Sequence, residues 1–161
     1  MIRRIAWPIA AAIAFALLVS LALHGERPEP GIVSFKAAGF LKQFTPEAAT
    51  EVDVASPTAH KHFRRDSDWP PRIDEALRLL RDSAPLRTMT AEEASTEPRS
   101  SYGLDDNAMV IVVRSAEGKT FTIRVGARNP LGSGLYATID GIEGVPILPA
   151  YVGDAWEQIL K

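Results

Sequence analysis

The first residues with potential chemistry are two histidines, two positions apart, in a segment expected to be a strand. His60 and His62 would then project from the same face of the extended chain, where two imidazoles can share a metal ion. The spacing fixes no third ligand, and Lys61, Arg64 and Arg65 make the neighbourhood cationic. His60 and His62 are therefore weak candidates for a metal site, and no cofactor is predicted.

The acidic pair Asp66 and Asp68 resembles the beginning of a calcium-binding loop. Trp69, Pro70 and Pro71 occupy the positions where further oxygen ligands and the turn glycine would be needed. We therefore expect an ordinary solvated turn here.

Two other kinds of catalytic or binding motif are not supported. Residues 132–134, Gly-Ser-Gly, suggest a phosphate-binding loop, but the next segment alternates like a strand, so no helix N-terminus would face the anion. A Ser-His-Asp hydrolase has no support, because the chain has three histidines and no nucleophile-elbow motif. No catalytic residue is predicted, and an enzyme is the least favoured interpretation.

The composition restricts the possible partners further. Cysteine is absent, which excludes disulfides, thiolate metal sites and cysteine nucleophiles. After Arg3 and Arg4 the chain carries 16 basic against 20 acidic residues. A weakly acidic domain lacks the concentrated basic face that phosphate backbones require, so nucleic acid is not an expected partner.

The N-terminal segment predicts a membrane anchor. Ile5 to Leu23 contains no charged residue, and at about 1.5 Å per residue this run nearly spans a hydrocarbon core of about 30 Å. Arg3 and Arg4 precede it and only Arg27 follows closely, so the positive-inside rule keeps the N-terminus cytoplasmic. The expected location is the bacterial inner membrane, crossed once, with the following domain in the periplasm.

Two alternatives to an anchor remain. Ser20 to Ala22 has small residues where a signal peptidase would cleave, but the apolar run exceeds the usual core of about 7–15 residues. A buried soluble helix would normally show a polar stripe. The expected organisation is an anchor at residues 1–25, a stiff proline-rich spacer at 26–31 and one domain at 32–161.

The exported part predicts an α+β domain of antiparallel hairpins packed with one main amphipathic helix and a short C-terminal helix. The main helix follows Pro70 and Pro71, because proline presets the first helical position and an apolar stripe follows at i, i+3, i+4 and i+7, namely Ile73, Ala76, Leu77 and Leu80. Residues 154–160 predict the closing helix, with Trp156, Ile159 and Leu160 buried. Residues 32–44 and 90–101 predict no definite element.

Alternating and β-branched segments predict the strands. They are a hairpin of 52–54 with 60–64, a strand at 109–113 covered on both faces, its hairpin partner 121–125, and strands at 135–139 and 145–148. Pro146 cannot donate a ladder hydrogen bond, so the last strand is predicted to lie at an edge or a bulge.

Several short motifs occur in a recognisable order. Trp69 precedes the main helix, Tyr102-Gly103-Leu104-Asp105 leads into a strand, Gly118-Lys119 lies in a hairpin that Val125-Gly126 closes, and Leu135-Tyr136-Ala137 comes before Asp140-Gly141. With this order, residues 52–160 resemble the bacterial domain of unknown function 4340 family. The chain departs from the family in having Asn107-Ala108 where a proline is usual, and in having a single copy of the unit.

The resemblance implies a membrane-tethered envelope protein, often associated with gliding-type ABC transporter components, and no catalytic residues. Trp69, Tyr102 and Tyr136 are expected to be core or rim aromatics, each open to use at an interface. The predicted function is a non-catalytic accessory or assembly subunit of an integral membrane complex. The alternative is a periplasmic module that binds a small ligand or a metal.

Overall fold

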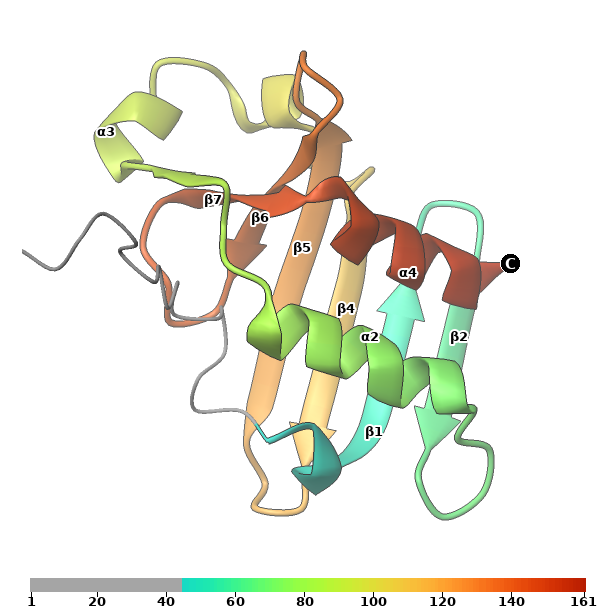
Figure 1. Cartoon of the computed structure of the whole chain (residues 1–161). Helices are drawn as coiled ribbons and strands as arrows, with labels where there is room; N and C mark the ends of the chain where they lie inside the picture. The colour runs from blue at the N-terminus through green and yellow to red at the C-terminus, as the bar shows by residue number, and fades with distance from the viewer. Residues whose placement is uncertain (1–44) are drawn as a thin grey trace, which may run out of the picture. The chain divides into compact units, whose positions relative to one another are not determined.

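The computed structural model describes residues 45–161, in which seven antiparallel strands form one sheet in the order β2-β1-β4-β5-β6-β7-β3 (Figure 1). The strands are β1 (Ala49–Ala55), β2 (His60–Arg64), β3 (Arg87–Met89), β4 (Met109–Ser115), β5 (Thr120–Arg128), β6 (Gly134–Ile139) and β7 (Val145–Pro149). The helices are α2 (Pro71–Asp82), α3 (Ala91–Ala94) and α4 (Ala150–Leu160), with 3-10 turns η1 (Pro46–Ala48) and η2 (Arg99–Tyr102). The predicted α+β class is confirmed.

The predicted anchor and the proline-rich spacer lie outside the described residues. Within residues 45–161, no helix is both long enough and apolar enough to cross a membrane.

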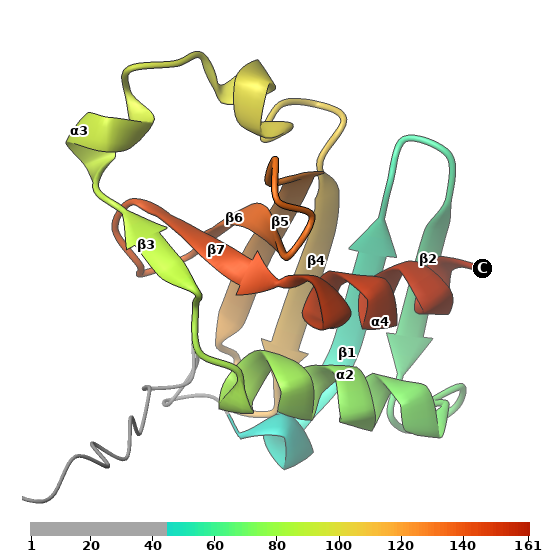
Figure 2. The ribbon, with the colours of Figure 1, turned by 45° about the horizontal axis from the view of Figure 1, so that its top comes forward.

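The main core lies between the sheet and the pair α2 and α4, which run side by side across one sheet face (Figure 2). Alternation along the strands turns Val52, Ile111 and Ile123 toward the helices, and all three are fully buried. Trp156 of α4 is the largest side chain that the core buries completely. Burial of this apolar surface is the main stabilising contribution to the fold.

Helix α2 confirms the prediction made from its periodicity. Ile73, Ala76, Leu77 and Leu80 are all buried, and the helix begins with a proline at its first position. The Ser83 Oγ just after α2 lies 3.0 Å from the Tyr151 hydroxyl near the beginning of α4, so the two helices run in opposite directions. Helix α4 begins at Ala150, earlier than predicted, and buries Trp156 and Ile159 but leaves Leu160 half-exposed.

The predicted hairpins are also confirmed. Val52 pairs with Phe63 in β1–β2, and Ile111 pairs with Ile123 in β4–β5. Strand β1 then pairs with β4, which brings the two hairpins into one sheet.

Strand β4 was predicted to be covered on both faces, and this is wrong. Met109, Ile111 and Val113 are buried, whereas Val110 and Val112 on the other side are only half-buried. The reason is that α2 and α4 lie on the same side of the sheet, so nothing among the described residues covers the opposite side of β4. Because every residue from Met109 to Val113 is apolar, the sequence shows no sign that burial alternates along the strand.

The prediction that Pro146 places the last strand at an edge or a bulge is wrong as well, because β7 is an inner strand and neither of its ladders has a register shift. Strand β7 lies between β6 and β3, and the three-residue β3 forms the edge. The β6–β7 ladder ends at Ile147, so Pro146 faces only Thr88 of β3. The missing amide of Pro146 is tolerated on the β6 side because the β6–β7 ladder ends before it reaches the proline.

Residues 90–108 form an arch that packs against β6 and β7 through a few side chains. Thr90 and Glu93 form a reciprocal capping box that begins α3, and η2 follows. A second small core lies beneath this segment and consists of Tyr102, Leu104 and Val145, with Met89, Ala94 and Tyr136 packed against it. Figure 2 shows the segment as an arch beyond the end of the sheet.

Candidate functional site

Among residues 45–161, no helix or loop packs on the sheet surface that faces away from α2 and α4 over β2, β1, β4 and β5, and we call this surface the open face. Cross-strand register places its residues in rows, such as His62, Asp53, Val112 and Thr122. The open face comprises Glu51, Asp53, Ala55, His60, His62, Arg64, Val110, Val112, Arg114, Thr120, Thr122 and Arg124, all of them half-buried or exposed.

His60 and His62 lie on the same side of β2, as the sequence predicts, and both approach one carboxylate. His62 Nδ1 is 2.7 Å from Asp53 Oδ1, and His60 Nε2 is 3.7 Å from the same oxygen. Asp53 is directly opposite His62 in the β1–β2 ladder, which explains the shorter contact.

Arg114 holds the second oxygen of this carboxylate. Its guanidinium is 2.7 Å from Asp53 Oδ2 and 3.2 Å from Glu51 Oε2. Partial burial of Asp53 acts to raise its pKa, but the hydrogen bonds from His62 and Arg114 outweigh this and leave the pKa below its ordinary value. The same hydrogen bond with Asp53 stabilises the charged form of Arg114 and holds the pKa of Arg114 above its ordinary value. Asp53 is therefore the centre of a network of acidic and basic side chains, which we call the ion network: Glu51, Asp53, His60, His62 and Arg114.

The metal-binding prediction for the two histidines gains no further ligand from the fold. Within residues 45–161, no three His, Asp or Glu side chains form a group that could hold a metal ion. Asp53 is shared with Arg114, and Arg64 on the same strand pairs with Asp66 at 3.0 Å. The polar contacts of His60 and His62 are with Asp53, in the exposed ion network.

An apolar strip and one unpaired charge lie beside this network. Val110 and Val112 are half-buried in the middle of the open face, and Arg124 lies opposite Val110 in the next strand. Arg124 is exposed, and its guanidinium has no ion pair or hydrogen bond with another described residue. The open face thus combines a small apolar centre with charges on either side.

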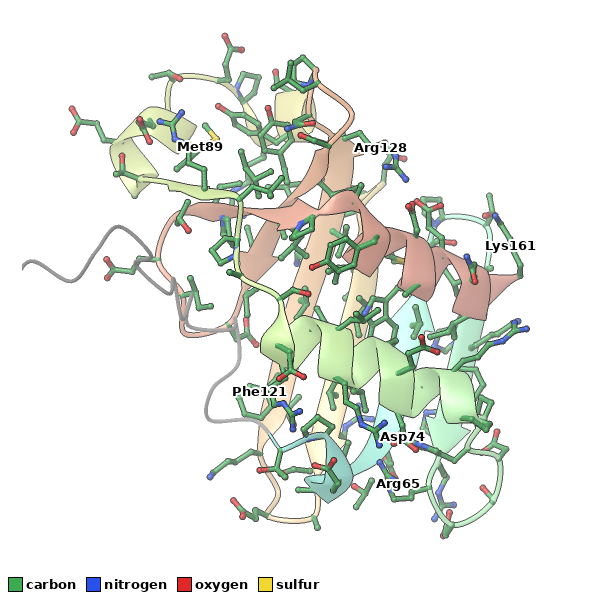
Figure 3. The ribbon with its side chains drawn as sticks, viewed as in Figure 1. Arg65, Asp74, Met89, Phe121, Arg128 and Lys161 are labelled. Carbon is green, nitrogen blue, oxygen red and sulfur yellow. The ribbon has the colours of Figure 1, made fainter. Side chains whose placement is uncertain are left out.

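Trp69 has a structural position away from the open face. Arg65 lies over its ring, with the guanidinium carbon 4.2 Å from the ring centroid. Arg65 also bonds to Asp74 at 2.8 Å and to the carbonyl oxygens of Pro46 and Ala49, as Figure 3 shows for the Arg65 and Asp74 pair. Trp69 therefore helps to fix the chain before α2.

The predicted motif at residues 102–105 docks the arch on the sheet. The rings of Tyr102 and Tyr136 meet edge-on at 5.0 Å between centroids. Leu104 is buried in the same cluster, and Asp105 Oδ1 accepts a hydrogen bond from the Asn107 amide at 3.0 Å. The turn made by Asp105 leads into β4.

Gly103 completes this motif. It has φ +64° in the left-handed region, where glycine avoids the steric cost of a side chain. A Cβ on Gly103 would also lie 2.5 Å from the Ala127 amide nitrogen. The glycine is required both by its backbone conformation and by its contact with β5.

The remaining candidate motifs form local turns. Asp68 accepts hydrogen bonds from the Arg64 amide and the Ser67 hydroxyl, and the first of these is the main cause of its lowered pKa. At residues 132–134, Asn129 Oδ1 accepts a hydrogen bond from the Gly134 amide, and strand β6 follows. This agrees with the expectation that no helix follows the glycines.

Sequence reasoning missed the ion network. The signal was present in part, because Glu51 and Asp53 alternate along one strand of a predicted hairpin and basic residues alternate along the other. Arg114 is 61 positions from Asp53, and no sequence pattern links them before the β1–β4 pairing is known.

The chain matches no family model, no curated protein and no solved structure in the three comparisons made. The resemblance to the domain of unknown function 4340 family therefore stays a prediction.

Proposed function

We propose that this protein is a membrane-tethered accessory subunit that docks through its open face on the periplasmic surface of an integral membrane complex. The observation that carries the proposal is a sheet surface that no other described segment covers, with Val110 and Val112 at its centre and charged side chains around them. An apolar centre with a polar surround is the usual arrangement of a protein interface. By the family resemblance, the complex is of the ABC transporter type.

The charges on the open face define the kind of partner surface that fits. Asp53 and Glu51 are already paired with Arg114, so they need no external cation. Arg124 has no described partner and lies beside Val110. The fitting surface therefore has an apolar centre to cover the two valines and a carboxylate to meet Arg124.

The short spacer supports a partner close to the bilayer. The sequence predicts a spacer of six residues, 26–31, between anchor and domain, and six residues reach only about 20 Å when fully extended. A domain tethered in this way explores a thin layer above the membrane, and this raises its effective concentration toward a membrane-bound partner.

Site-specific photocrosslinking in the full-length chain tests this function. A photoreactive residue at Val112 is expected to yield a discrete crosslink to an integral membrane protein, and the same residue at Arg72 on the exposed side of α2 is expected to yield none. A reporter fused after Lys161 is expected to be active in the periplasm. Equal crosslinking from both positions, or a cytoplasmic reporter, would contradict the proposal.

A further inference from the structure

A hollow of about 430 Å³ lies between the arch of residues 90–108 and strands β6 and β7, and we call it the arch pocket. Its volume falls in the range of about 300–1,000 Å³ that is usual for small-ligand sites. Tyr102, Leu104 and Val145 line its apolar part, and Glu97 and Arg99 line its rim.

The apolar part of the pocket is held in place by close backbone packing. Gly103 packs closely against Ala127 of β5. On the β7 side, a Cβ on Gly144 would lie 2.1 Å from the Met89 carbonyl oxygen, so the chain before Val145 is held against β3. Tyr102, Leu104 and Val145 belong to the second core and are each less than 10 % exposed. The floor is thus formed before any ligand enters, which reduces the entropic cost of binding.

The rim carries opposite charges that do not neutralise each other. Glu97 and Arg99 flank Pro98, yet no ion pair joins them. Among the described residues, the Glu97 carboxylate accepts a single hydrogen bond, from Ser101 Oγ at 3.4 Å. The Arg99 guanidinium has no hydrogen bond or ion pair with another described residue. By contrast, Arg87 of β3, just before the arch, is paired with Glu93. The unpaired Arg99 and the Glu97 carboxylate, which has no ion pair, lie beside apolar side chains. This combination complements a small zwitterion with an apolar tail.

We infer that the arch pocket binds a free α-amino acid with an apolar side chain. Its carboxylate bonds to Arg99, its ammonium group to Glu97, and its side chain rests on Tyr102, Leu104 and Val145. Arginine suits the carboxylate because its planar guanidinium presents paired donors. This inference does not depend on docking at the open face.

Calorimetric titration of the full-length protein in detergent with L-phenylalanine tests the inference. Phenylalaninamide lacks the carboxylate and N-acetylphenylalanine lacks the ammonium group. Each is expected to bind at least about tenfold more weakly, because a hydrogen bond between charged groups is lost. The dipeptide Phe-Phe keeps both charges but separates them, so it is expected to bind more weakly than the free amino acid.

Two substitutions assign the charges. Arg99→Gln is expected to weaken phenylalanine binding and to abolish its advantage over the amide, while Glu97→Gln abolishes its advantage over the N-acetyl compound. Arg72→Gln and Glu75→Gln, exposed changes on α2, are expected to leave all affinities unchanged. No binding of phenylalanine at about 10 mM would overturn the inference. Equal affinity for phenylalanine and its amide, or tighter binding of Phe-Phe, would also overturn it.

Discussion

Gly126 packs directly against the backbone of Gly103, so that a Cβ on Gly126 would lie 2.9 Å from the Gly103 carbonyl carbon and 2.3 Å from the Tyr102 carbonyl oxygen. The two glycines are 23 positions apart, and their contact joins the arch to β5. The Tyr-Gly-Leu-Asp motif is therefore bound to the sheet by backbone contact as well as by the packing of Tyr102 on Tyr136.

Alanine at Gly103 is expected to cost about 2–5 kcal/mol of unfolding free energy, because it adds a steric clash to the cost of a left-handed residue. Gly118→Ala is the matched control, since Gly118 has φ +75° with nothing within 4 Å of an added Cβ. Its expected cost is only about 1–2 kcal/mol. Urea unfolding of both variants measures the difference, and equal costs would show that the contact with β5 contributes nothing.

Leu77→Ala is expected to destabilise the domain by about 2–5 kcal/mol. Leu77 lies on the core-facing side of α2 and is completely buried, so its truncation leaves a cavity. Leu79 on the same helix is half-buried, so Leu79→Ala is the control and is expected to cost about 1 kcal/mol. Thermal melts compare the two. A smaller effect at Leu77 than at Leu79 would contradict the assigned core face.

The ion network predicts a pH-dependent contribution to stability. Because the pKa of Asp53 is lower in the folded protein than its ordinary value of 3.8, the ionised form favours folding. The contribution is fully present above the ordinary pKa and is lost as the pH falls through the folded value.

Asp53→Asn is accordingly expected to be less stable than the wild type at pH 7, and the gap should close as the pH falls from about 5 to about 2. Glu143→Gln, at an exposed residue without a described partner, is expected to show no such gap. Urea unfolding across this pH range measures both variants. A gap for Asp53→Asn that widens on acidification would contradict the assignment.

The local elements could be predicted from the sequence, but their tertiary environments could not. Periodicity identified α2, and alternation identified β1, β2 and β5, because in these segments burial changes along the chain with the period of the element. In β4 the residues on both sides are apolar, so the exposure of Val110 and Val112 depends on which side the helices occupy. The short edge strand β3 and the arch depend on tertiary contacts, such as Gly103 with β5, that leave little periodic signal.

The candidate site was predictable only in part, for a similar reason. His60 and His62 sharing one face follows from a strand period of two. Their shared partner Asp53 and its bond to Arg114 require the strand register and the β1–β4 pairing.

The double substitution of His60 and His62 by alanine is expected to change the unfolding free energy by no more than about 0.5 kcal/mol, as is usual for exposed residues. The wild type is expected not to respond to a chelator. Metal analysis of the purified protein provides the check. Stoichiometric zinc or copper in the wild type that is lost from the double variant would favour the metal-binding alternative over an accessory subunit.

Binding of the open face to a membrane-bound partner is tested most directly by the yield of partner that co-purifies with the chain. The partner is crosslinked to the chain through a photoreactive residue at Val112. Full-length wild type, Arg124→Glu and Arg72→Glu would be isolated from detergent-solubilised membranes. Arg124 and Arg72 are both exposed and without a described partner, so neither change should disturb the fold. Arg124→Glu is expected to lower the yield of the partner by about tenfold or more through charge repulsion, and Arg72→Glu to leave it unchanged. Equal partner yields from all three proteins would contradict docking through the open face.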